Sequence, residues 1–194
     1  MDAAGLKKVP KWKRSITRVS THGFDVEEFS TRKRPNRRYG LIFPGRKRYT
    51  VDNKILVAVD VSGSISLELY KEFNKHLNHM LKHADFDVLF FNDTLLMKNG
   101  DRWYWRGDND VWEPKKFLHR YKRDMSIPIG GGTNFEPVIQ FWNKFRRGYN
   151  GLYIFTDGDA YYNTEPSETE KVNWLIYGSG ARINHGKKHI MTMD

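Results

Sequence analysis

The chain has 194 residues, no cysteine and a formal net charge of +10. The lack of cysteine excludes disulfides, thiolate zinc sites and cysteine nucleophiles, and it is compatible with the reducing cytoplasm, where we expect the protein to act. No apolar run approaches the length of a membrane span and the N-terminus has no apolar signal core, so we expect no membrane partner.

The positive charge is concentrated in the first quarter of the chain. Residues 1–50 hold 14 lysines and arginines against 4 acidic residues, whereas residues 51–194 hold 19 of each. This split predicts a basic N-terminal arm over residues 1–50 and a charge-balanced domain over residues 51–194. The arm lacks a clear hydrophobic period, so we expect it to be extended, with a short helix around Lys11–Val19.

Apolar runs alternate with amphipathic stretches through the rest of the chain. Helices are predicted from Ile65 to Ala84 and after the glycine run within Gly130–Gly148, where Pro137 suits the first turn. The alternation predicts an α/β fold, with a doubly wound, mostly parallel sheet and helices on both faces, preceded by the basic arm. Its strands are expected within Lys54–Asp60, Phe86–Asn92, Gly151–Ala160, Lys171–Ser179 and Lys188–Asp194.

Residues 95–129 interrupt this alternation. Turn signals between apolar runs in Leu95–Trp112 predict a hairpin. Its aromatic residues form either a recognition surface or a small core of the hairpin itself, and the sequence does not separate these two readings. They are Trp103, Tyr104, Trp105 and Trp112.

Hard oxygen groups follow several predicted strands. Asp60, Ser62 and Ser64 follow the first buried strand, Thr133 follows a run of glycines, and Asp157 follows a later strand. In an open parallel sheet, function gathers at the carboxyl ends of the strands. Oxygen ligands with few carboxylates suit Mg²⁺ or Mn²⁺ better than Zn²⁺. We therefore predict a Mg²⁺ (or Mn²⁺) site with one position open to a carboxylate from outside.

The stretches DVSGS, GGGTN and FTDGD resemble the metal-ion-dependent adhesion site of von Willebrand factor A-type (VWA) domains, which have a Rossmann-like fold. With STRKRPNRRYGLIFPG and GGGTNFEPV, the chain most resembles the VWA-like C-terminal domain of bacterial predicted metallopeptidases encoded beside MoxR-type AAA+ ATPases. The resemblance implies that an AAA+ ATPase or its client is the partner. It also implies these metal ligands, some of them acting through water: Asp60, Ser62, Ser64, Thr133 and Asp157.

The chain departs from this family in two respects. The metallopeptidases carry a longer N-terminal region with a zinc motif, whereas this sequence has no H-E-x-x-H, so the resemblance gives no reason to expect peptidase activity. The resemblance covers roughly residues 54–194. Within this range, residues 95–129 look like an insertion relative to the compact VWA pattern.

Simpler readings exist for several of these residues. Asp60 and the two serines can cap the helix that begins near Ile65, although capping leaves the other two ligands unexplained. Asp93 is either an outer-shell residue of the ion or a plain loop aspartate. Asp159 is either a second carboxylate near the ion or, as we prefer, a turn residue. His76, His79 and His83 recur at helical spacing. His79 and His83 could bind zinc, but a polar helix face is preferred for the three because no third ligand stands out.

The basic run Arg32, Lys33, Arg34, Arg37 and Arg38 can contact nucleic acid or a partner, and we prefer a structural or partner-binding role. Taken together, these features lead us to expect a non-enzymatic module that binds the carboxylate of a partner protein through Mg²⁺ or Mn²⁺. The alternatives are a metal-dependent, phosphoesterase-like hydrolase, in which the ion activates water, and a nucleic-acid binder that acts through the arm.

Overall fold

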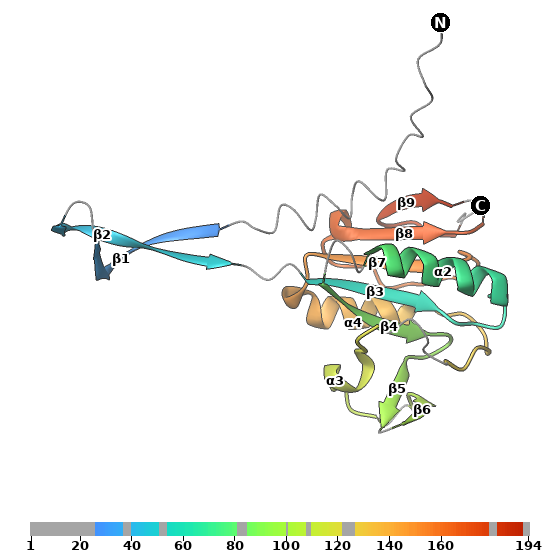
Figure 1. Ribbon diagram of the computed structural model, residues 1–194. Coiled ribbons are helices and arrows are strands. Elements are labelled where there is room, and N and C mark those ends of the chain that lie inside the picture. Colours follow the sequence, from blue (N-terminus) through green and yellow to red (C-terminus); the bar gives the residue numbers. More distant parts are fainter. Residues whose placement is uncertain are drawn as a thin grey trace, which may run out of the picture.

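The computed structural model describes residues 26–36, 40–50, 54–80, 85–99, 101–107, 110–121, 127–178 and 182–191 (Figure 1). For residues 26–36 and 40–50 it describes the backbone alone. The predicted helix around Lys11–Val19 lies outside the described residues, as do Arg37, Arg38 and His83.

A five-stranded sheet forms the centre of the domain (Figure 1). Its strand order is β4-β3-β7-β8-β9, and every neighbouring pair is parallel. The inner strands are continuous apolar runs because both of their faces are covered. The predicted mostly parallel α/β fold is confirmed. The strands are β3 (Lys54–Asp60), β4 (Asp85–Phe91), β7 (Gly151–Thr156), β8 (Val172–Ile176) and β9 (Lys187–Ile190).

Helices α2 (Leu67–Met80) and α4 (Glu136–Phe145) cover opposite faces of this sheet (Figure 1). Successive side chains of a strand point to opposite faces, so β3 contributes to two separate hydrophobic clusters. Its residues Ile55, Val57 and Val59 pack in the cluster that contains α2, whereas Leu56 and Ala58 pack in the cluster that contains α4. Pro137 lies in the first turn of α4, as its position in the sequence predicts.

The order of the strands creates a switch point beside β3. The chain passes from β3 outward to β4 and then returns across β3 to β7. In doubly wound sheets, ligands bind in the crevice at the carboxyl ends of the strands where the order reverses. Asp60 ends β3 and Asp157 directly follows β7, so both aspartates lie at this switch point.

The described parts of residues 95–129 form a peripheral unit on the β4 side of the sheet (Figure 1). Strands β5 (Leu96–Asn99) and β6 (Arg102–Trp105) form an antiparallel hairpin, which confirms that prediction, and the short helix α3 (Pro114–Phe117) follows. The four aromatic residues are partly buried and join the two main clusters: Trp103 and Trp105 pack with the α2 cluster, and Tyr104 and Trp112 with the α4 cluster. The hairpin therefore extends the domain core instead of building a core of its own.

The basic arm contains two long strands, β1 (Val26–Asn36) and β2 (Gly40–Thr50), which pair with each other in an antiparallel two-stranded sheet. In Figure 1 this ribbon lies apart from the five-stranded sheet. We expected an extended arm but not the pairing of its two halves. Among the helices that the structure describes, none is long and apolar enough to cross a membrane.

Candidate metal centre

The turn after β3 brings the carboxylate of Asp60 close to the hydroxyls of Ser62 and Ser64. Asp60 is fully buried, and its Oδ1 accepts the backbone N–H of Ser62 at 2.9 Å. The Ser62 and Ser64 hydroxyl oxygens lie 3.1 Å apart. Ser62 is buried whereas Ser64 is exposed, so the turn leads from a buried charge to the surface.

Helix capping is performed by a different residue of the same loop. The Ser66 hydroxyl accepts the backbone N–H of Leu69 at 3.1 Å, three residues further on, which is the arrangement of an N-cap serine at the start of α2. The capping interpretation therefore does not account for Asp60, Ser62 and Ser64.

The end of β7 is joined to the same carboxylate. The Thr156 hydroxyl donates to Asp60 Oδ2 at 2.7 Å and accepts the backbone N–H of Gly158 at 3.0 Å. The loop that carries Asp157 is thereby attached to Asp60. Our sequence reasoning missed Thr156. The detectable signal is its place as the last residue of a buried strand, immediately before the candidate ligand.

The glycine run lies alongside the serine turn. The N–H of Gly63 donates to the Gly131 carbonyl at 2.9 Å, and the N–H of Gly130 donates to the Val61 carbonyl at 2.9 Å. Gly131 has a φ of +87°, and a side chain there would collide with the amide of Asn92. Only glycine meets both requirements without strain, and the close approach brings the loop that carries Thr133 to the serine turn.

Asp93 and Asn92 hold the two neighbours of Thr133. Asp93 Oδ2 accepts the N–H of Gly132 at 2.9 Å, and the Asn92 carbonyl accepts the N–H of Asn134 at 3.0 Å. Asp93 therefore contacts the backbone of the loop that presents Thr133. Its role toward an ion stays a prediction, but its contact gives it a means of positioning that loop.

Asp159 has a partner outside the centre. Its carboxylate forms an ion pair with Arg182 at 2.9 Å, and the Arg182 guanidinium lies over the Tyr161 ring at 4.5 Å from the centroid. The backbone N–H of Asp159 approaches Asp157 Oδ1 at 3.3 Å. These contacts favour the turn interpretation of Asp159, with its backbone supporting Asp157.

Hydrogen bonds of Glu136 join α4 to the segment after Asp157. Our sequence reasoning missed this contact. The Glu136 carboxylate accepts the backbone N–H groups of Asn163 at 3.0 Å and Thr164 at 3.1 Å, and it also accepts the Thr164 hydroxyl. Burial alone would raise the pKa of Glu136, but these hydrogen bonds outweigh it and leave the pKa below its ordinary value. Glu136 thus connects the helix after Thr133 to the segment after Asp157.

The electrostatics of the centre are dominated by a buried negative charge. Burial raises the pKa of Asp60 to about 6, although hydrogen bonds from Ser62 and Thr156 oppose the shift, and the nearby charge of Asp157 adds to it. In the part of the chain that the structure describes, no lysine, arginine or histidine forms an ion pair with Asp60 or Asp157. The centre is therefore acidic and without a protein cation among the described residues.

The donor set fits a hard cation. Within the described residues, no three histidine, aspartate or glutamate side chains gather as a metal-binding group, so hydroxyls would have to complete a ligand set around Asp60 and Asp157. Neighbouring ligands of octahedral Mg²⁺, each about 2.1 Å from the ion, are about 3.0 Å apart. The 3.1 Å between the Ser62 and Ser64 oxygens matches one such edge. The residues that could hold the ion are Asp60, Ser62, Ser64, Thr133 and Asp157.

His76 of α2 has partners of its own in the core. His76 is buried, and its Nε2 lies 2.6 Å from the Tyr177 hydroxyl and 3.4 Å from Glu72 Oε1. We had expected a polar helix face here. His76 instead packs against Phe155, with the two rings stacked at 6.5 Å, and this places the imidazole in the core.

The fold and the candidate centre define an α/β protein with acidic and hydroxyl side chains in the loops at the switch point of its sheet. No family model and no solved structure matches the chain. A protein of Thermotoga maritima described as uncharacterized is 27% identical to it over 147 residues, which are 76% of this chain and 33% of that protein. The chain thus spans about a third of the length of this relative.

Proposed function

We propose that this chain is a metal-dependent protein-interaction module. Ser62, Ser64 and Thr133 would hold Mg²⁺ or Mn²⁺, with Asp60 and Asp157 supplying negative charge directly or through water. The ion would keep a position for the carboxylate of a partner protein. The resemblance to VWA-like domains encoded beside MoxR-type AAA+ ATPases suggests such an ATPase, or its client, as the partner.

The observation that carries this proposal is the buried charge of Asp60, which accepts hydrogen bonds but has no cationic partner among the described residues. A carboxylate that is fully buried at the carboxyl end of a central strand is costly unless something compensates it. Its hydrogen bonds come from a backbone N–H and a threonine hydroxyl, with a serine pair next to it. A divalent cation above the serines would supply the missing positive charge.

The surroundings of the centre favour a macromolecular ligand. Three large apolar side chains that the structure exposes lie next to its three loops: Leu67 follows the serine turn, Ile129 precedes the glycine run, and Tyr161 follows the Asp157 loop. Their exposed fractions are 68%, 36% and 68%. A partner protein that bound the ion through a carboxylate would cover these side chains with apolar groups of its own.

A pull-down with a purified MoxR-type AAA+ ATPase tests the proposal. Wild-type chain is expected to retain the ATPase in Mg²⁺ and to release it in EDTA, whereas Asp157→Ala is expected to bind equally little in both. Asp101→Ala removes one carboxylate from the exposed β5–β6 turn and serves as the matched control. Retention that is unchanged by EDTA would contradict a metal-dependent interface with this partner. Calorimetry with Mn²⁺ on the same proteins separates two outcomes. A wild type that binds Mn²⁺ but not the ATPase keeps the metal centre and loses this partner, whereas a wild type that binds no Mn²⁺ contradicts the metal centre itself.

A substitution at Asp93 tests whether the Thr133 loop must be held in place. Asp93→Ala removes the acceptor of the Gly132 N–H, so Mn²⁺ affinity is expected to fall by about tenfold, the lower end of what losing an outer-shell partner costs. Asp93→Asn keeps a side-chain oxygen in the same place and should recover most of the affinity. Equal losses in both variants would point to the charge of Asp93 instead of its hydrogen bond. Isothermal calorimetry measures all three proteins.

A further inference from the structure

The register of the arm brings two basic triplets together. Thr31 pairs with Gly45, and the next pair joins Pro35 to Pro44. Gly45 and Pro44 are adjacent in β2, so the three residues Arg32–Arg34 of β1 form a bulge with no residue opposite them. Arg46–Arg48 begins immediately after Gly45 and pairs with residues 28–30 of β1. Six cationic residues that are remote in sequence therefore flank one cross-strand pair.

This stretch of the ribbon is nearly free of compensating charge. Between Glu28 and Pro35 on β1, and between Pro44 and Arg48 on β2, the only acidic residue is Glu28, which pairs with Arg48. Six cations within one stretch of the ribbon repel one another through the medium around them, and an isolated two-stranded ribbon is at best marginally stable in water. Since β1 and β2 pair with no other described strand, a bound polyanion would relieve both weaknesses.

We propose that the β1–β2 ribbon binds double-stranded DNA through its phosphates. The major groove of B-DNA is about 12 Å wide and admits a two-stranded antiparallel ribbon, whereas the major groove of an RNA duplex is too narrow for side chains to read. Basic residues alongside the groove displace counterions from the phosphates, which is the main source of affinity in such complexes. The two triplets are the groups that would do so here.

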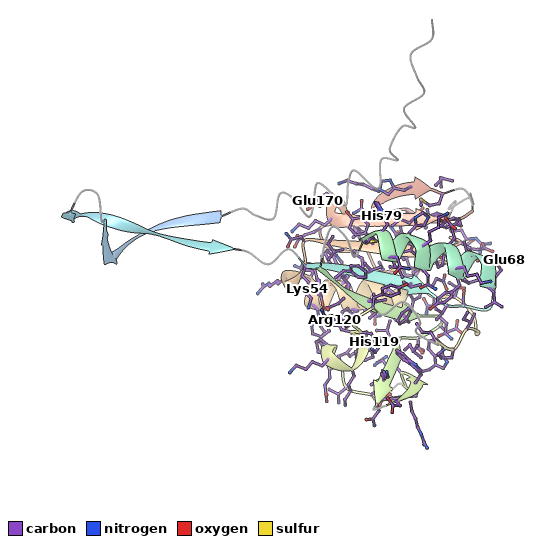
Figure 2. The ribbon with its side chains drawn as sticks, in the orientation of Figure 1. Lys54, Glu68, His79, His119, Arg120 and Glu170 are labelled. Atoms are coloured by element: carbon purple, nitrogen blue, oxygen red, sulfur yellow. The ribbon has the colours of Figure 1, made fainter. Side chains whose placement is uncertain are left out.

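The ribbon and the candidate metal centre are attached to opposite ends of β3. Strand β2 leads to Lys54 at the amino end of β3, whereas Asp60 ends the strand at the metal centre. Figure 2 shows Lys54 and Glu68, which lies in the first turn of α2 beyond the serine turn, at opposite sides of the domain. DNA binding by the ribbon is therefore independent of the proposed metal-dependent interaction, and EDTA should leave it unchanged.

Fluorescence anisotropy with a labelled 20-base-pair duplex tests this inference. The full chain is titrated at several KCl concentrations between 50 and 200 mM, with EDTA present. Variant Arg46→Gln/Lys47→Gln/Arg48→Gln is expected to weaken binding at least about tenfold and to reduce the slope of log K against log salt by about 3, since each phosphate contact contributes about 0.9. Arg32→Gln/Lys33→Gln/Arg34→Gln, on the other strand, should give the same result.

A charge-matched control separates the ribbon from net charge. Lys115→Gln/Arg147→Gln/Lys187→Gln removes three exposed cations from the domain and is expected to change the affinity less than about twofold. Wild-type affinity in both ribbon variants, or an equal loss in this control, would overturn the inference. So would competition by polyglutamate that is as effective as unlabelled duplex, because the ribbon would then be a site for acidic protein. Thermal unfolding of each variant checks that the domain remains folded.

Discussion

A Ser62→Ala/Ser64→Ala double variant is expected to lose Mn²⁺ and Mg²⁺ affinity by more than about 100-fold, because both serines are proposed as direct ligands and even an outer-shell partner is worth about 10- to 100-fold. The two hydroxyls are 3.1 Å apart and lie next to the buried Asp60, so they would supply one edge of the coordination shell. Alanine leaves the backbone N–H bond to Asp60 in place. The variant should therefore remain folded while losing the ligands, and isothermal calorimetry measures the loss.

The control for this experiment lies two residues further along the chain. Ser66→Ala removes the N-cap hydroxyl of α2, which should lower the free energy of unfolding by about 1 kcal/mol and leave Mn²⁺ affinity unchanged. The pair of variants thus distinguishes ion binding from helix capping within one loop. Wild-type Mn²⁺ affinity in the double variant, or loss of affinity in Ser66→Ala, would contradict the assignment of Ser62 and Ser64 as ligands.

The sheet and its helices could be predicted because burial leaves a local pattern. The run from Ile55 to Val59 is apolar at every position, since its residues alternate between the α2 and α4 clusters. In α2, Leu69, Phe73 and Leu77 recur at helical spacing because one face packs on the sheet. The carboxyl ends of parallel strands share one edge, so the sequence also predicted that these loops lie at the same edge of the sheet. The strand order that creates the switch point came from the structure alone.

The supporting contacts of the centre could not be predicted in the same way. Thr156 reaches Asp60 because β3 and β7 are neighbours in register, and Glu136 reaches the backbone of residues 163 and 164 because α4 packs beside that loop. Neither contact leaves a periodic signal, because each joins residues that are distant in the chain. A polar residue at the end of a strand indicates only that some partner exists.

The pairing of β1 with β2 was missed for a related reason. Neither strand has the apolar–polar alternation that a half-buried strand shows, because the ribbon has no sheet or helix to pack against among the described elements. The sequence of the arm does show an excess of positive charge, and such an excess indicates a negatively charged partner but does not indicate a fold. The candidate ligands are a similar case, because a D-x-S-x-S stretch predicts an ion site only when other loops that carry oxygen groups lie nearby.

The stability of the protein in EDTA is expected to fall as pH rises from about 4 to 6 because of Asp60. Its pKa is about 6 in the folded state against 3.8 as the ordinary value, so the folded state binds the proton more tightly. Below pH 3.8 both states are protonated and the stabilisation is fully present; above pH 6 both are ionised and it is lost. The shift corresponds to a loss of up to about 3 kcal/mol.

Asp60→Asn isolates this effect, because the amide keeps an oxygen for the Ser62 N–H but carries no charge. The unfolding free energy of wild type minus that of Asp60→Asn should fall by up to about 3 kcal/mol between pH 4 and 7. The same difference for the control Asp101→Asn should stay nearly constant, because Asp101 is exposed and its charge is not buried. Urea unfolding at each pH gives these values. Parallel curves for wild type and Asp60→Asn would mean that the Asp60 carboxylate is hydrated in solution.

The same comparison with Mn²⁺ links stability to the proposed function. A cation that binds only the folded state stabilises it by about 2.7 kcal/mol at 100 times its dissociation constant, which is close to the penalty expected from Asp60 at neutral pH. Mn²⁺ should therefore restore wild type at pH 7 and have no effect on Asp60→Asn. If both results are obtained, the buried carboxylate destabilises the free domain and its cost is offset by a bound ion, which would make Asp60 a residue kept for binding at the expense of stability.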